Sequence, residues 1–226
     1  MLTKITNFLL DLIFPPLCIA CRKHLETKQE KAALLCAKCL SSIIIYNQIF
    51  YSENFPFLAV SRYDSPIVRK IIHTLKYQKM TGAITPIKYL IKSYFENLYF
   101  KTIFEESEWT IVPVPLHKKK KRKRGFNQAF LIAEVLQKNL QIFYPNKKFK
   151  IETVLQKNKT TKAQAELNLK ERKTNIIGTF KAKGGIEGNF IIADDVFTSG
   201  ATLNEAAKTL KKAGADKIAG FVVAKT

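Results

Sequence analysis

The chain has 226 residues, a length that suits one ordinary domain with a small additional module. Hydrophobic residues make up 46% and charged residues 25%, which excludes a disordered or fibrous chain. No stretch approaches the roughly 18 apolar residues that a membrane-spanning helix needs, so we expect no membrane insertion. The 38 Lys and Arg against 18 Asp and Glu give a net charge of +20, which favours polyanionic partners such as nucleic acids or phosphorylated small molecules.

The N-terminal residues 5–14 are mostly apolar, but we do not expect them to be a targeting segment. Asp11 interrupts the apolar run, Pro15 and Pro16 end it, and no small-residue cleavage site follows. The pattern predicts a short amphipathic helix that packs on the rest of the protein.

All four cysteines follow this stretch as two C-x-x-C pairs, at Cys18, Cys21, Cys36 and Cys39. Two such pairs across a short spacer let four thiolates converge on one Zn²⁺. Two disulfides or a redox-active pair are the alternatives, but a chain of this size does not need disulfides to be stable. We therefore predict a structural zinc site in a cytoplasmic protein, with His24 exposed to solvent and not bound to the metal.

From about residue 57 onward, predicted strands alternate with predicted helices. The strands are expected at residues 57–63, 110–115, 189–195 and 217–223, with another ending at residue 180. The helices are expected from residue 66 through at least 75, and at residues 85–99, 126–140 and 201–213. Residues 155–175 are polar and suggest a mobile loop or short helix. This alternation predicts an α/β domain with a mostly parallel sheet over residues 51–226, after a module of residues 1–50.

Two adjacent carboxylates, Asp194 and Asp195, end the apolar strand at residues 189–195, and a run of small residues follows them. Ligands bind at the carboxyl ends of strands in α/β sheets. The hydroxyls of Thr198, Ser199 and Thr202, together with the free N–H groups at the start of the next helix, suit a phosphate. The acids suit two neighbouring hydroxyls or Mg²⁺. A diol next to a phosphate describes a ribose 5-phosphate.

This segment resembles the signature of the phosphoribosyltransferase fold, which binds phosphoribosyl pyrophosphate (PRPP). Over nearly its whole length, the chain further resembles the ComF family of competence-associated proteins. The resemblance is carried by the cysteine module, Leu75-Lys-Tyr77, Val112-Pro-Val-Pro-Leu-His117, Arg124-Gly-Phe-Asn-Gln128 and the segment at 190–202. The family usually has Arg where Lys157 and Lys159 stand here. The resemblance implies a type I phosphoribosyltransferase-like fold with a small zinc-ribbon-like module at the N-terminus.

The resemblance also implies roles for individual residues. Asp194 and Asp195 would hold the ribose hydroxyls and the metal, and would be the catalytic residues of any transfer reaction. The 5-phosphate would be bound by Thr198, Ser199, Gly200, Ala201 and Thr202. The turn of Pro113, Val114 and Pro115 would face the pyrophosphate, and residues 157–172 would form a mobile flap. The implied cofactors are structural Zn²⁺ and Mg²⁺ bound with PRPP.

Seven consecutive cations follow the proline-rich turn, at Lys118, Lys119, Lys120, Lys121, Arg122, Lys123 and Arg124. Such a run is often only a solvated loop. Its position after Pro115 places it beside the expected phosphate pocket, where it would bind the backbone of single-stranded DNA by counterion release. Tyr77 and Phe126 are candidates for stacking on bases, although Phe126 is more typical of a core residue.

Two histidines and the single tryptophan have expected positions near these segments. His73 is expected at the boundary of the core, and Trp109 is expected to pack within it. His117 follows the proline-rich turn and is a candidate for contacting phosphate.

The leading hypothesis is a ComF-like protein that binds PRPP and single-stranded DNA and assists DNA uptake in natural transformation, together with competence machinery such as an ATP-dependent DNA translocase. One alternative is an active phosphoribosyltransferase with an unidentified acceptor. Another is a PRPP-sensing regulator whose DNA affinity changes with ligand.

Overall fold

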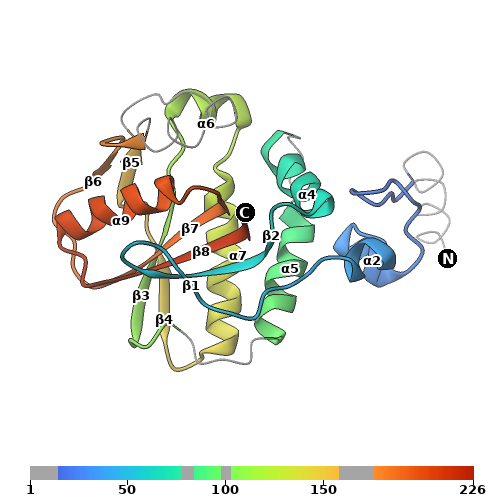
Figure 1. Ribbon diagram of the computed structural model, residues 1–226, viewed down its shortest axis with the longest axis horizontal. Helices are drawn as coiled ribbons and strands as arrows, with labels where there is room; N and C mark the ends of the chain where they lie inside the picture. The colour runs from blue at the N-terminus through green and yellow to red at the C-terminus, as the bar shows by residue number, and fades with distance from the viewer. Residues whose placement is uncertain (1–14, 78–83, 98–102, 158–175) are drawn as a thin grey trace, which may run out of the picture.

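A computed structural model of the chain describes residues 15–77, 84–97, 103–157 and 176–226, and its centre is a six-stranded sheet (Figure 1). Across the sheet the strands are β1 (Phe50–Tyr51), β2 (Pro56–Arg62), β8 (Lys217–Lys225), β7 (Asn189–Phe197), β3 (Glu108–Pro113) and β4 (Lys148–Ile151). Neighbouring strands pair in parallel except for β1, which is antiparallel to β2. The predicted α/β class with a mostly parallel sheet is therefore confirmed.

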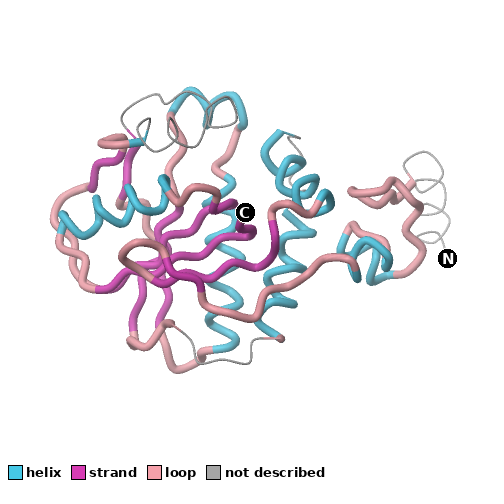
Figure 2. The backbone as a smooth tube through the Cα atoms, in the orientation of Figure 1, coloured by secondary structure: helices cyan, strands magenta, loops and turns pink. Residues whose placement is uncertain are grey.

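Helices cover both faces of the sheet, as Figure 2 shows. Alternate residues of each central strand face opposite sides, so that Ile191 and Phe221 belong to one apolar cluster and Ile192 and Val222 to the other. The first face is covered by α4 (Pro66–Tyr77), α5 (Thr85–Glu96) and α7 (Gln128–Phe143), and the second by α9 (Ala201–Ala213). Because both faces are covered, the central strands are apolar almost throughout.

The cysteine module extends from the side of the sheet that carries α4 and α5 (Figure 1). It contains two short helices, α2 (Lys28–Ala33) and α3 (Ala37–Ser41). Thr27 and Glu30 form a capping box that satisfies the first N–H groups of α2. The buried side chains of the module continue into the core of the sheet domain, and Gln29 donates a hydrogen bond of 3.1 Å to the Tyr89 hydroxyl on α5. The division of the chain at residue 50 stays a prediction.

Most predicted elements agree with the structure, and several boundaries shift. The helix expected at residues 201–213 is α9 over those same residues, and β7 and β8 run two residues beyond their predicted ends. The strand predicted to end at residue 180 instead begins there, because β6 (Phe180–Ala182) pairs antiparallel with β5 (Leu155–Lys157). The predicted helix at residues 5–14, the end of the helix at 85–99, and residues 158–175, which include most of the predicted flap, lie outside the described residues.

The basic run forms a helix, α6 (Lys118–Arg124), where a loop was considered. Lys and Arg have high helix propensity, and the His117 side chain caps the first turn by accepting a hydrogen bond from the backbone of Lys119. Gly125, with φ of 88°, ends the helix in the left-handed conformation. No helix within the part of the chain that the structure describes is long and apolar enough to cross a membrane.

Candidate functional site

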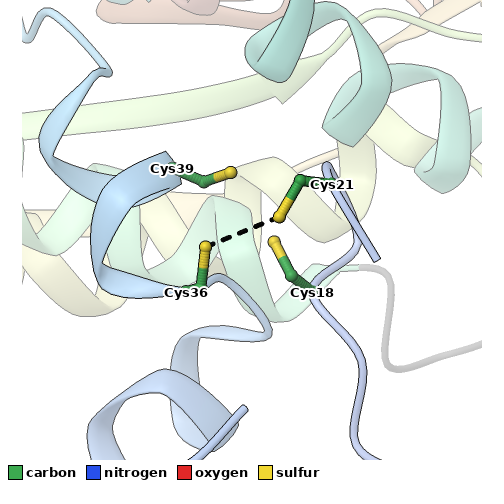
Figure 3. A group of neighbouring side chains, drawn as sticks. All are labelled: Cys18, Cys21, Cys36 and Cys39. Atoms are coloured by element: carbon green, nitrogen blue, oxygen red, sulfur yellow. Dashed lines mark hydrogen bonds between the residues drawn. The ribbon is translucent and has the colours of Figure 1, made fainter. Parts of the chain in front are cut away.

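The four cysteines converge on one point between the two halves of the N-terminal module. Their sulfur atoms all lie within 4.8 Å of one another and point toward a common centre (Figure 3). The Sγ atoms of Cys21 and Cys36 are 3.6 Å apart, close to the ~3.8 Å edge of a tetrahedron with Zn–S bonds of about 2.3 Å. None of the four forms a disulfide. This arrangement fits a structural zinc ion, while His24 is exposed and outside the cluster, as predicted.

The environment of the cysteines favours a thiolate at one of them before metal binds. Burial opposes ionisation of Cys18, but backbone N–H groups of Cys21 and Cys36 that point at its sulfur lower the pKa of Cys18 to about 7. Burial raises the pKa of Cys39. Because a metal takes thiolates and releases their protons, a cluster in which one thiol ionises near neutral pH suits a cation.

A cavity of about 520 Å³ lies at the carboxyl ends of β3 and β7. The segments after β2 and β3, the ends of α4 and α6, and the loop after β7 surround it, and α6 and the end of α4 lie at the same end of the sheet in Figure 1. Its charged lining, among the described residues, consists of Arg69, Lys76, Lys120, Arg124, Lys157, Asp194 and Asp195. The cavity thus joins two acids to five cations.

The paired acids are held rigidly at the floor of this cavity. Asp194 and Asp195 are 9% and 5% exposed. Oδ1 of Asp194 accepts a 2.8 Å hydrogen bond from the backbone of Asp195, and Oδ1 of Asp195 lies 2.7 Å from the ammonium of Lys76. Oδ2 of Asp195 is buried without a hydrogen-bond donor among the described residues. A buried acceptor without a donor is costly to stability.

Burial sets the charge balance of the pocket. Burial and the neighbouring Asp195 charge raise the pKa of Asp194 to about 7. Burial and repulsion from Lys120 lower the pKa of Lys157 to about 8. Burial opposes the charge on Lys76, yet the Asp195 and Asp194 carboxylates raise the pKa of Lys76 above its ordinary value. The pocket is therefore net cationic near neutral pH, with its positive charge arranged around the acids.

The residues expected to bind the phosphoribosyl group divide between two sides of the loop after β7. Those that line the cavity are Val114, Pro115, Asp194, Asp195, Thr198 and Thr202. Pro113 is the last residue of β3 and is buried in the sheet. Ser199 and Ala201 line a different cavity on the other side of α9. Gly200 is the buried N-cap of α9, with φ of 73°, and no side chain caps the first turn of this helix.

The basic helix presents only part of its charge to the cavity. Lys120 and Arg124, one helical turn apart, line the cavity, as does His117. The other cations of the run, which do not line it, are Lys118, Lys119, Lys121, Arg122 and Lys123. All five are exposed, and α6 has no buried residue. The run is thus divided between the ligand pocket and an outer surface.

Aromatic rings lie beside this helix at the rim of the cavity. Tyr77 is 64% exposed, its ring lies 4.6 Å from the ring of His73, and the Arg124 guanidinium lies 5.6 Å from its centroid. His73 is exposed, so its predicted place at the core boundary is wrong, because it faces the cavity side of α4. Phe126 packs against the core, and Trp109 is 3% exposed, as predicted.

Sequence reasoning gave no role to Lys76, Arg69 or Tyr63, all of which line the cavity. The signal was the spacing within α4, where positions 69, 73, 76 and 77 are polar and share one helix face. The opposite face carries the buried residues of the helix. The pattern shows only that this face is not packed in the core, and the structure is needed to place it at the cavity.

Comparison with known proteins supports the zinc module. A family model described as a double zinc ribbon domain matches residues 9–50. Competence protein F of Haemophilus influenzae is 35% identical over 112 residues, which cover 48% of this chain and 46% of that protein. Competence protein ComFC of Bacillus subtilis is 32% identical over 123 residues, covering 54% and 46%. Over these segments the chain is similar to the two competence proteins. It matches a little under half the length of these two relatives.

Other similarities are weaker. The DNA utilization protein YhgH of Escherichia coli K12 is 25% identical over 195 residues, which cover 85% of this chain and 78% of that protein. Among solved structures, a purine phosphoribosyltransferase from Pyrococcus horikoshii is 16% identical, with a TM-score of 0.27 over 67% of this chain and 86% of that one. A similarity at that TM-score has no weight by itself. The comparisons therefore support a similarity to the two competence proteins and a zinc ribbon at the N-terminus.

Proposed function

We propose that the cavity binds a phosphoribosyl ligand such as PRPP. The observation that carries this proposal is the composition of the cavity lining. It contains two buried acids, one of which has an oxygen without a hydrogen-bond partner, together with five cations and two threonines. Carboxylates accept hydrogen bonds from a diol, and cations neutralise phosphates. A ribose that carries phosphates is the ligand class that uses both halves of the lining.

In this scheme each group of residues has a separate task. Asp194 and Asp195 accept hydrogen bonds from the ribose hydroxyls. Thr198, Thr202 and the uncapped first turn of α9 bind the 5-phosphate, since helix N-termini favour anions. The cations on α6, with Lys157, lie where they can bind the pyrophosphate. Mg²⁺ was expected with PRPP, but Lys76 already neutralises Asp195, so this scheme uses only cations of the protein.

The second part of the proposal is that α6 binds single-stranded DNA. The seven consecutive cations of α6 repel one another, most strongly between neighbours on the same helix face. Phosphates of a nucleic-acid backbone would relieve that repulsion. Tyr77 adds an exposed ring on which a base can stack. A strand bound along α6 would therefore pass the mouth of the cavity.

The relatives named for competence and DNA utilization support a role in handling incoming DNA during natural transformation. We place this role in the cytoplasm, where thiols remain reduced and available to zinc, in cooperation with an ATP-dependent DNA translocase. The observation that Lys120 and Arg124 belong both to the cavity and to α6 favours one further candidate function, a PRPP-sensing regulator. Transfer of phosphoribose to an acceptor is the enzymatic alternative, in which Lys120, Arg124 and Lys157 would stabilise the charge of departing pyrophosphate.

Removing outward charge from α6 tests the DNA half. The triple variant Lys119→Gln, Arg122→Gln and Lys123→Gln is expected to bind single-stranded oligonucleotide about 100-fold more weakly at low salt. The slope of log K against log[salt] should become shallower by about 2, because each lost phosphate contact removes about 0.7 from that slope. Fluorescence anisotropy over a range of salt concentrations measures both quantities.

The matched control replaces three exposed lysines on α7 and β4, as Lys138→Gln, Lys148→Gln and Lys150→Gln. It changes the net charge equally and should leave the salt slope almost unchanged. Equal losses in the two variants would mean that only overall charge matters, and would remove α6 as the DNA site.

Tyr77→Ala tests stacking independently of charge. The affinity for single-stranded oligonucleotide should fall about 5- to 100-fold, as expected for the loss of one base–aromatic stack, with no change in the salt slope. Tyr51→Ala removes a ring that is 75% exposed on β1 and is the control, with no expected effect. A change of salt slope in Tyr77→Ala, or equal losses in both variants, would contradict a stacking role.

A further inference from the structure

The ammonium of Lys76 forms an ion pair with one of the two acids that line the cavity. It lies 2.7 Å from Oδ1 of Asp195, and the two side chains are 23% and 6% exposed. Lys76 comes from the last turn of α4, whereas Asp195 comes from β7 in the middle of the sheet. This contact therefore holds together two elements that are far apart in the sequence, and its charges are largely removed from water.

Two of the four carboxylate oxygens of the pair are already engaged by groups of the protein. Oδ1 of Asp194 accepts the backbone N–H of Asp195, and Oδ1 of Asp195 is paired with Lys76. Mg²⁺ requires six oxygen ligands at about 2.1 Å in near-octahedral geometry. A divalent ion on this pair would also approach the Lys76 ammonium, which has the same sign of charge.

The neutralising charge for phosphates is already present in the lining. Arg69, Lys120, Arg124 and Lys157 surround the same cavity as the acids. Oδ2 of Asp195 is buried and has no hydrogen-bond donor among the described residues. A ribose hydroxyl would supply one. The lining therefore already supplies cations for phosphates, whereas no described group donates a hydrogen bond to Oδ2 of Asp195.

We propose that Lys76 is a built-in replacement for the divalent cation, so that this pocket binds its phosphoribosyl ligand without Mg²⁺. The ligand class rests on the function proposed above, while the exclusion of metal by Lys76 does not. Lys76 is in this view the residue that determines the metal dependence of the site. It acts by neutralising the acid pair and by keeping Asp195 oriented toward the ligand.

Titration calorimetry with PRPP tests the ligand half. Buffers are freed of divalent ions with a chelating resin and not with a soluble chelator, so that zinc stays in the cysteine module. The wild type should bind PRPP with an affinity that changes less than about 3-fold when excess Mg²⁺ is added. Lys76→Met should bind at least about 10-fold more weakly without Mg²⁺, as expected when a charge-assisted contact is lost, and should recover when Mg²⁺ is added.

Lys70→Met, at an exposed position of the same helix, is the control and should behave as the wild type. Binding by the wild type only when Mg²⁺ is present would overturn the proposal and leave the proposed ligand intact. If the wild type bound no PRPP under either condition, the proposed ligand would be wrong, and a second measurement would still decide the role of Lys76.

That measurement uses Mn²⁺ alone, followed by electron paramagnetic resonance of the free ion. The wild type should bind no Mn²⁺ at the acid pair, Lys76→Met should gain one site, and adding Asp195→Asn to that variant should remove it. A site in the wild type that disappears in Asp195→Asn would overturn the proposal. Because these wild-type results need no substitution at Lys76, the test also survives if Lys76→Met fails to fold.

Discussion

Replacing Cys39 with Ser is expected to abolish stoichiometric zinc binding and to unfold the N-terminal module. Cys39 is 7% exposed, and its sulfur faces the other three cysteines. Apparent binding energies of structural zinc are of the order of 10 kcal/mol or more, far larger than a module with two short helices gains from burial. We expect amide hydrogen exchange to become fast over residues 15–44 while the central strands stay protected.

The control is His24→Ala, which removes the one histidine close to the cysteines in sequence. His24 is exposed and outside the cluster, so zinc content and exchange rates should match the wild type. Zinc is measured with a colorimetric chelator after denaturation. Full zinc content in Cys39→Ser that is lost on adding His24→Ala would show that histidine replaces the thiolate. Full zinc content in Cys39→Ser, both with and without His24→Ala, would contradict a four-cysteine site.

The parts of the fold that were predicted well are those where one local rule decides the outcome. The apolar run before Asp194 was expected to be a buried parallel strand, and it lies in the middle of the sheet as β7. Gly214 was expected to end the last helix, and it does so with φ of 116°. In both cases side-chain burial and backbone conformation favour the same structure, so no distant contact has to be known.

The parts that were missed depend on contacts between distant segments. β5 lies where a loop or short helix was predicted, and β6 begins where a predicted strand was expected to end. These strands of three residues each form only because they pair across a gap of more than twenty residues. Lys76 looks like any solvent-exposed lysine at the end of an amphipathic helix. Only the three-dimensional structure places its ammonium against Asp195, which lies more than a hundred residues later in the chain.

The basic helix shows a different limit of sequence reasoning. Seven adjacent cations suggested a solvated loop, because like charges repel one another. Repulsion among exposed charges is weakened by water and salt, and the caps at His117 and Gly125 favour the helix locally. Helical periodicity places two residues of the run at the cavity and five facing outward. The expectation of a loop gives no basis for predicting this division.

Replacing both acids, as Asp194→Asn and Asp195→Asn, is expected to weaken PRPP binding by about 2 kcal/mol or more, roughly 30-fold. This is the loss expected when hydrogen bonds from hydroxyls to buried carboxylates become bonds to neutral amides. Inorganic pyrophosphate, which has no ribose, should behave in the opposite way. Its affinity should stay the same or rise, because the variant pocket keeps five cations and loses its two acids.

The opposite responses of the two ligands separate recognition of the sugar from simple attraction of anions. Asp216→Asn, at an exposed position where the side chain accepts the Gly188 N–H, is the matched control and should change neither affinity. Thermal unfolding of the double variant is measured first, because Lys76 loses its partner there. A folded variant that binds PRPP as tightly as the wild type would show that the acids do not hold the ribose. Equal weakening of PRPP and pyrophosphate would show that they act only by shaping the pocket.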